Sequence, residues 1–164
     1  MTFAQSLRAP SLWVALAVAF STGALGGLLT PLGPWYRALE KPVFQPPDWL
    51  FGPAWTTIFL LSAFAAHRLW RAAAVGKART LVVTLFAINI ACNLGWSYLF
   101  FFIQRPDLAV FDAVALWLSV LSIMLAVGGL APISRWLLAP YLGWVTFATV
   151  LNVAIVTLNG PFGA

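Results

Sequence analysis

Long apolar stretches with at most one charged residue each divide this chain into segments, and short polar or proline- and glycine-rich connections separate them. The stretches cover about residues 10–30, 49–70, 80–103, 108–127 and 134–158. Each is near or above the roughly 20 residues that a helix needs to cross a bilayer. A membrane β-barrel would instead need short segments of alternating polarity. The pattern therefore predicts an all-α bundle of five transmembrane helices, forming a single membrane domain over residues 1–164.

Helix-breaking residues mark the ends of these segments. Pro31 closes the first, and Gly128 with Gly129 closes the fourth. Ser134 has the residue type expected at the N-cap of the fifth helix. Pro140 lies in the first turns of that helix, where a membrane bundle tolerates a kink.

The amino-acid composition favours a protein embedded in lipid over a soluble globular protein. Hydrophobic residues make up 62% of the chain and charged residues 8%, with a mean hydropathy of +0.94. So few polar residues cannot cover the surface of a soluble domain. The net charge of +5 is scattered among apolar runs and forms no contiguous basic face for nucleic acid.

The connection at residues 31–48, PLGPWYRALEKPVFQPPD, is long and contains five prolines. Proline fixes the backbone angle φ, so an extended path with a short helical turn near residues 34–39 is expected rather than a flexible linker. A stiff loop of this length is typical of a lid.

Lys and Arg are distributed unevenly between the two sides of the predicted bundle, which bears on orientation. One side has basic residues without an acid: Arg8, Arg68, Arg71, Lys77, Arg79 and Arg135. The other balances three basic with three acidic residues: Arg37, Lys41, Arg105, Glu40, Asp48 and Asp107. In a plasma membrane the N-terminus is therefore expected in the cytoplasm and the C-terminus outside.

Two polar and aromatic stripes are candidates for function. Asn89, Asn93 and Trp96 fall on one face of the third helix. The fifth helix carries a second stripe spaced by four, with one apolar neighbour: Trp144, Ala148, Asn152 and Leu151. Facing stripes of rings, small residues and amides suit a flat apolar ligand, held in a cavity shared by helices two, three and five under the lid. Alternatively, the amides hold the helices together.

Other polar residues point to structural roles. Asp112 is the acid inside a predicted helix, about one turn from its start, and no second acid at depth completes a proton relay. His67 and Cys92 lack partners at metal-ligand spacing, so no metal site is expected. No arrangement of nucleophile, base and acid is present in the sequence either.

Small residues predict close helix approaches. Gly23 and Gly27 form a GxxxG pair in the first helix, and Ala87, Ala91 and Gly95 form a ladder in the third. The spacing does not distinguish packing within one bundle from a homodimer through either face.

Three motifs extend the analysis beyond spacing. Residues 35–59 (WYRALEKPVFQPPDWLFGPAWTTIF), 93–101 (NLGWSYLFF) and 140–152 (PYLGWVTFATVLN) occur in order over most of the chain. They resemble the first loop with second helix, the third helix and the fifth helix of the translocator protein family, the TspO/MBR or tryptophan-rich sensory proteins.

The resemblance implies a five-helix bundle, often dimeric, whose pocket under the first loop binds porphyrins, haem-like molecules and benzodiazepine-type drugs without a required cofactor. Val153 and Thr157 stand where sterol-binding members have Tyr and Arg, so sterol transport is not expected. Motif positions, together with the stripe on the third helix, place these residues in the pocket: Trp49, Trp55, Asn89, Asn93, Trp96, Trp144, Ala148, Leu151 and Asn152.

The leading functional hypothesis is a membrane sensor or regulator that binds protoporphyrin IX, haem or a similar tetrapyrrole. The first alternative is a light- and oxygen-dependent porphyrin-degrading enzyme, because Trp55 and Trp144 match a tryptophan pair proposed for that reaction in bacterial relatives. The second is a transporter, although the sequence has no evident inverted repeat and no paired acids for coupling ions.

Overall fold

The computed structural model describes residues 8–126 and 129–163, and the regular elements in these ranges are all helical. Five of the helices are long and apolar enough to cross a membrane, which confirms the predicted fold class. The elements, in chain order, are α2 (Pro10–Leu28), α3 (Pro34–Ala38), the 3₁₀ turn η1 (Asp48–Leu50), α4 (Phe51–Ala72), α5 (Lys77–Ser97), the π turn η2 (Tyr98–Phe102), α6 (Pro106–Ala126) and α7 (Pro132–Asn159).

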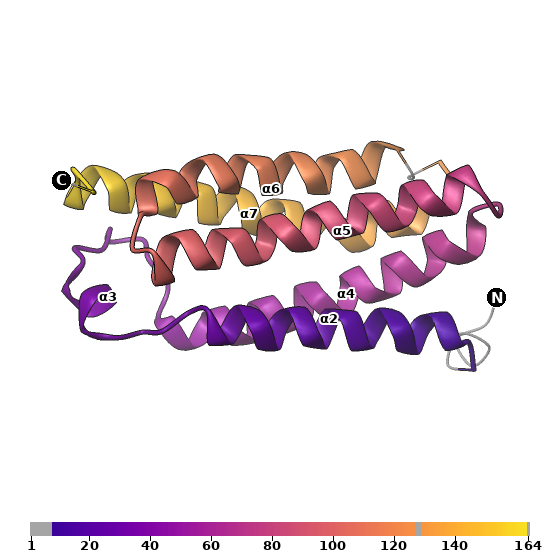
Figure 1. The fold of residues 1–164 in the computed structure, drawn as a ribbon, viewed down its shortest axis with the longest axis horizontal. Coiled ribbons are helices and arrows are strands. Elements are labelled where there is room, and N and C mark those ends of the chain that lie inside the picture. The colour runs from indigo at the N-terminus through magenta and orange to yellow at the C-terminus, as the bar shows by residue number, and fades with distance from the viewer. Residues whose placement is uncertain (1–7, 127–128, 164) are drawn as a thin grey trace.

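The five long helices lie side by side along one axis, with α3 at the end where α7 finishes (Figure 1). Extensive contacts join α2 to α4, α4 to α7, α7 to α6 and α6 to α5. The contacts that close this ring, between α5 and α2, are much sparser. The bundle is therefore a ring with one loosely packed seam.

Proline residues start several helices, as expected for a residue that lacks a backbone donor. Pro10, Pro34 and Pro132 occupy first-turn positions of α2, α3 and α7. The short α3 lies where the sequence predicted a helical turn. Pro140 lies inside α7, also as predicted.

Two sequence-based bounds need correction. Ser134 is not the N-cap of α7, because the helix begins at Pro132 and Ser134 Oγ instead donates to the backbone oxygen of Ala65 at 3.3 Å. The helix α5 begins at Lys77, earlier than expected, because charge-free runs omit a charged first turn. The predicted end of the fourth helix at residues 127–128 lies outside the described residues.

The apolar interior forms two clusters. The larger involves α4, α5, α6 and α7 and includes Leu69, Val120 and Leu138. The smaller lies under the lid and includes Tyr36, Phe101 and Leu151. Helix α2 buries little, since its fully buried residues are Leu12 and Thr22. A peripheral α2 beside a sparse seam leaves room for cavities.

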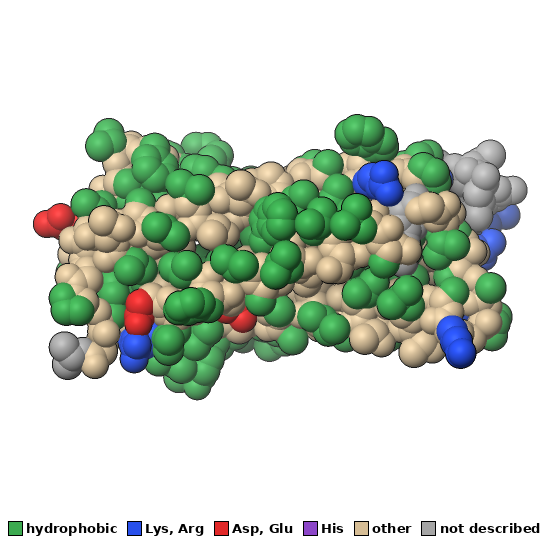
Figure 2. Space-filling model, turned by 90° about the horizontal axis from the view of Figure 1, so that it is seen from above, with side chains coloured by type: hydrophobic (Ala, Val, Ile, Leu, Met, Phe, Trp, Pro, Cys, Tyr) green, Lys and Arg blue, Asp and Glu red, His purple; other side chains and the backbone are tan. Residues whose placement is uncertain are grey.

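Charged side chains separate along the bundle axis. In Figure 2 the acidic side chains of the visible face lie in one half, and most basic ones lie toward the other end. We call the end with α3 the lid end, residues 31–48 the lid, and the opposite end the basic end. Apolar side chains cover much of the face between the ends. The chain is an integral, multi-pass membrane protein by its five apolar spans.

Candidate ligand-binding cavity

A cavity of about 520 Å³ lies under the lid, between α2, α4 and α5. This volume is within the range usual for small-molecule sites. Residues from four parts of the chain line it: Ala19, Phe20, Gly23, Ala24, Gly26, Gly27, Thr30, Leu32, Tyr36, Asp48, Phe51, Gly52, Trp55, Thr56, Phe59, Leu60, Asn93, Trp96, Ser97 and Phe101. The cavity combines aromatic rings with small residues and a few polar groups.

Aromatic rings of α4 and α5 form two sides of the cavity. Trp55 packs edge-on against Tyr141, with ring centroids 5.9 Å apart, and stacks on Phe59 at 5.4 Å. On α5, the Trp96 ring contacts Phe101 at 5.9 Å. Rings held by neighbouring rings keep their orientation, because each has few alternative rotamers in a packed cluster. These sides are therefore fixed surfaces for stacking.

Small residues of α2 form the opposite side. A methyl group added at Gly27 would meet nothing within 4 Å, and one at Gly26 would reach only Leu94 at 4.0 Å. At Gly23 the methyl group would lie 3.3 Å from the Phe59 ring. The GxxxG pair in this chain thus leaves space beside the cavity at Gly27 and permits a close approach only at Gly23.

The roof of the cavity is part of the lid. Tyr36 donates its hydroxyl to Oδ1 of Asp48 at 2.9 Å, and Gln45 Nε2 donates to Tyr36 at 3.2 Å. Burial, with the adjacent Asp48 carboxylate, raises the pKa of Tyr36 to about 12. Tyr36 is therefore a neutral donor across the physiological range, and it ties the start of the lid to its end.

The middle of the lid is attached to α7. The Glu40 backbone N–H donates to Asn159 Oδ1 at 2.8 Å, and Asn159 Nδ2 donates to the Glu40 backbone oxygen at 2.9 Å. The Phe44 ring contacts Phe147 of α7 at 6.4 Å. The proline-rich segment is thus pinned at several points, which supports its interpretation as a stiff lid.

A chain of hydrogen bonds runs from the cavity into the bundle. Asn93 lines the cavity and its Nδ2 donates to the Tyr141 hydroxyl at 3.2 Å. That hydroxyl donates to Asn89 Oδ1 at 3.2 Å, and Asn89 Nδ2 donates to Ser119 at 2.8 Å. Satisfied polar networks inside an apolar bundle fix the positions of their members. Asn93 is held in place by this network, whereas Asn89 mainly joins helices, the alternative that the sequence left open.

The stripe on the fifth helix lies behind the cavity, not in its lining. Asn152 is fully buried, accepts from Trp96 Nε1 at 3.0 Å and donates to the Pro106 backbone oxygen at 2.9 Å. Leu151 packs in the cluster under the lid, and Ala148 is half-buried. The ring of Trp144 contacts Trp55 at 6.4 Å, almost perpendicular to it.

The structure thus corrects the expected position of the cavity. The sequence analysis placed it between helices two, three and five, but the first helix closes it and the fifth supports it from behind. Trp49 is 70% exposed on η1 and does not line the cavity. Of the nine predicted site residues, Trp55, Asn93 and Trp96 line it directly.

Sequence reasoning missed Tyr36, Asp48, Phe51 and Phe59 as lining residues. Tyr36 and Asp48 belong to the lid, which the sequence predicted without assigning it any lining residue, and Phe51 is the first residue of α4. The glycines of α2 did give a signal, but we interpreted it only as helix packing.

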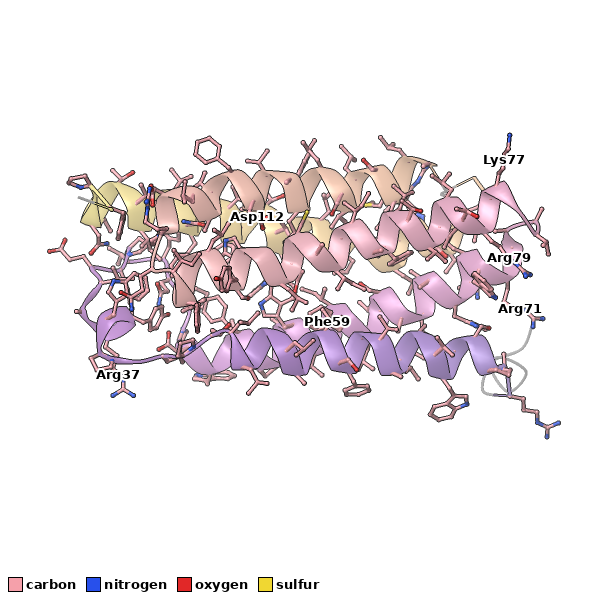
Figure 3. The ribbon with its side chains drawn as sticks, in the orientation of Figure 1. Arg37, Phe59, Arg71, Lys77, Arg79 and Asp112 are labelled. Carbon is pink, nitrogen blue, oxygen red and sulfur yellow. The ribbon has the colours of Figure 1, made fainter. Side chains whose placement is uncertain are left out.

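The part of the chain that the structure describes contains no group of three or more metal-ligating side chains. Asp112 packs over Gly95, where an added methyl group would lie 3.1 Å from Oδ1. Its other oxygen, Oδ2, is buried without a hydrogen bond to any described residue. Figure 3 shows Asp112 on the side of α6 that faces α5.

Fold and cavity together define a class: a multi-pass membrane protein with an apolar, ring-lined ligand cavity under a structured lid. Comparison with known proteins gives the family. The TspO/MBR family model matches residues 13–158, and the chain belongs to this family.

Curated relatives match most of the chain. The tryptophan-rich protein TspO of Chlorobaculum tepidum is 37% identical over 151 residues, which cover 91% of this chain and 96% of the relative. Protein CrtK of Rhodobacter capsulatus is 35% identical, covering 84% of this chain and 85% of that protein. The human translocator protein is 28% identical, covering 74% and 72% respectively.

Proposed function

We propose that this protein binds a metal-free tetrapyrrole, such as protoporphyrin IX, in the cavity under the lid. The observation that carries the proposal is the pairing of fixed rings with an open glycine surface. Trp55 and Trp96 present aromatic faces, while Gly27 leaves space on the opposite side. A flat macrocycle gains stacking on one face and close backbone approach on the other.

Polar groups of the cavity match the edges of such a ligand. Asn93, fixed by Tyr141, offers an amide to a pyrrole nitrogen in the interior. Two cations of the lid, Arg37 and Lys41, lie at the same end and suit the carboxylates of the macrocycle. Figure 3 shows Arg37 at the lid end. No His, Cys or Met is among the described lining residues, and the hydroxyl of Tyr36, the one lining side chain of another haem-ligand type, donates to Asp48. A metal-free ring therefore fits better than haem.

A sensory or regulatory role follows from the lid. A bound macrocycle would contact Tyr36 and Asp48 in the roof, and the lid is joined to α7 through Asn159. Occupancy of the cavity would therefore bias the lid and the end of α7 together. A relative 35% identical over 88% of this chain bears the name tryptophan-rich sensory protein, which supports this role.

Titration of protoporphyrin IX into detergent-solubilised protein, followed by Trp fluorescence, tests the proposal. Asn93→Ala and Trp96→Phe should each weaken binding, whereas Trp49→Phe, at an exposed position, should not. Unchanged affinity in both cavity variants would overturn the assignment of this cavity.

A second candidate function is light- and oxygen-dependent breakdown of the bound porphyrin. The geometry that favours it is the contact of Trp55, which lines the cavity, with Trp144 behind it, at 6.4 Å between ring centroids. Indoles are electron donors, so two in contact can pass an electron to the excited ligand and share the resulting radical cation, with dioxygen as the terminal oxidant. Loss of the porphyrin absorption band in illuminated samples must depend on Trp55 and Trp144, because free porphyrin bleaches without protein.

The distribution of basic residues and the small-residue faces also suggest an orientation in the membrane and a dimer interface. The basic end, which we place in the cytoplasm of a plasma-membrane protein, carries five basic residues: Arg68, Arg71, Lys77, Arg79 and Arg135. Ala87 and Ala91 are exposed on α5 and offer a small-residue face for a homodimer, whereas Gly95 is covered by Asp112 of the same chain.

A further inference from the structure

A second cavity, of about 650 Å³, lies along the same seam in the basic half of the bundle. It shares Ala19, Phe59 and Asn93 with the cavity under the lid and extends away from them. Figure 3 shows Phe59 near the middle of the bundle length. Its lining comes from α2, α4 and α5 together with Tyr141: Pro10, Ser11, Val14, Ala15, Val18, Ala19, Thr22, Phe59, Ser62, Ala63, Ala66, Trp70, Val82, Val83, Phe86, Ala87, Asn89, Ile90, Asn93 and Tyr141.

The length of this cavity corresponds to one leaflet of a bilayer. Its lining residues on α2 run from Pro10, the first residue of the helix, to Thr22. Twelve residue steps at about 1.5 Å each span about 18 Å, a little more than half of the roughly 30 Å hydrocarbon core. The cavity therefore begins at the membrane interface of the basic end and reaches the middle of the bilayer.

The walls between these limits are mainly aliphatic. Val14, Val18, Val83 and Ile90 line the cavity along α2 and α5. Because the seam between α2 and α5 is sparsely packed, lipid tails have access from the side. A narrow apolar trough one leaflet deep suits a saturated or unsaturated acyl chain.

Cations without a partner anion lie near the cavity at the basic end. The Arg79 guanidinium lies 4.7 Å above the ring of Trp70, which is itself a lining residue. Arg79 Nε is buried and has no hydrogen bond to any described residue, and the same holds for Arg68 Nε on α4. Arg71 lies in the last turn of α4, and Figure 3 shows Arg71 and Arg79 at the same end of the bundle.

The protein supplies no acid at this end to pair with these cations. Its four acidic residues are Glu40, Asp48, Asp107 and Asp112, and the first three lie in the lid or at the start of α6 at the lid end. A buried guanidinium N–H without a partner is costly. A phosphate group is the natural partner, because Arg donates to it with paired N–H groups.

We propose that the second cavity is a binding site for an anionic phospholipid, with an acyl chain along α2 and the phosphate against Arg79. Trp70 lies between chain and headgroup, the interfacial position that tryptophan favours. A free anion would leave the apolar trough empty, and an uncharged lipid would leave the guanidinium without its partner. The site is independent of the proposed function of the cavity under the lid.

Native mass spectrometry of the full-length protein in detergent tests the headgroup. Dioleoyl phosphatidylglycerol should bind about ten-fold better than dioleoyl phosphatidylcholine, because the choline ammonium of the latter offsets the phosphate charge that faces the cations at this end. Arg79→Gln should remove that preference, whereas Arg79→Lys should keep part of it. Arg135→Gln is the matched control, because it removes one charge at the same end where Arg135 Nε contacts the Met124 backbone oxygen instead. Equal loss in both Gln variants would overturn the site in favour of general surface attraction.

A second pair of variants tests the acyl chain. Ala15→Phe fills the trough, and Ala17→Phe adds the same ring at an exposed position two residues away. Ala15→Phe should lower phosphatidylglycerol binding at least several-fold with Ala17→Phe unchanged. Inorganic phosphate should not compete. Competition by phosphate, or a lipid preference unaffected by Ala15→Phe, would contradict the proposal, as would loss of protoporphyrin IX binding in Ala15→Phe with lipid preference retained.

Discussion

The indole N–H of Trp96 donates to Oδ1 of Asn152 at 3.0 Å, joining the third transmembrane helix to the fifth. Asn152 also donates to the Pro106 backbone oxygen at 2.9 Å, so one amide holds α5, α6 and α7 together. Trp96 lines the cavity and Asn152 does not. The fifth-helix amide therefore fixes the position of a residue that lines the cavity.

Asn152→Ala should destabilise the protein by about 1–3 kcal/mol, because it leaves a buried indole N–H and a buried carbonyl oxygen without partners. Thermal unfolding in detergent measures the loss. The double variant Trp96→Phe/Asn152→Ala should lose less than the sum of the single variants. Additive losses would mean that the 3.0 Å contact carries no coupling.

Tyr36→Phe should speed ligand release several-fold, since it removes the hydroxyl that joins the start of the lid to Asp48 at its end, and a typical hydrogen bond contributes ~1 kcal/mol. The raised pKa of Tyr36, about 12 against 10.0 for free tyrosine, means that its contribution to stability is present below pH 10. It is lost as the pH rises from 10 through 12. Dissociation rates measured by dilution at pH 7 should separate Tyr36→Phe from wild type, and equal rates would count against a latching role.

Asn159→Ala should release the middle of the lid from α7, because both hydrogen bonds to Glu40 come from this one side chain. Hydrogen exchange at the Glu40 amide should become faster, while exchange in the middle of α5 stays slow. Asn159→Asp keeps the acceptor for the Glu40 N–H and should show an intermediate rate. No change at the Glu40 amide in the alanine variant would show that the lid is held elsewhere.

Phe59→Ala should join the two cavities, because the ring lies where their linings meet. The protein should lose about 3–5 kcal/mol at most, less if lipid or ligand fills the space. Protoporphyrin IX affinity should fall through loss of the stacked Trp55–Phe59 pair. An affinity equal to that of wild type would place the macrocycle away from this ring.

Much of the fold followed from the sequence, because helix length, apolar runs and proline positions are local properties. The stripe of Asn89, Asn93 and Trp96 was placed on an inward face by its period alone, and Asn89 and Asn93 are buried. The periodicity of the sequence could not show which helix closes the cavity. Helix α2 is apolar on all sides, and a surface facing lipid has the same composition as one facing an apolar cavity. The order of helices around the ring decides between them, and periodicity does not encode that order.

The role of the fifth helix shows the same difficulty at the level of single residues. Trp144 and Asn152 were expected in the cavity because rings and amides at regular spacing suit ligands and helix contacts equally. In the structure, Asn152 is hydrogen-bonded to Trp96 and to Pro106, and the Trp144 ring contacts Trp55. Only the three-dimensional arrangement of the helices distinguishes a residue that lines the cavity from one that packs behind the lining.

The most direct test of the ligand cavity is a protoporphyrin IX titration, by Trp fluorescence, of two glycine variants. Gly27 lines the cavity and Gly143 does not, and a methyl group added at either position meets nothing within 4 Å. Gly27→Phe should weaken binding about ten-fold or more by occupying the space of the macrocycle, and Gly143→Phe should bind as wild type does. Wild-type affinity in Gly27→Phe would contradict the account.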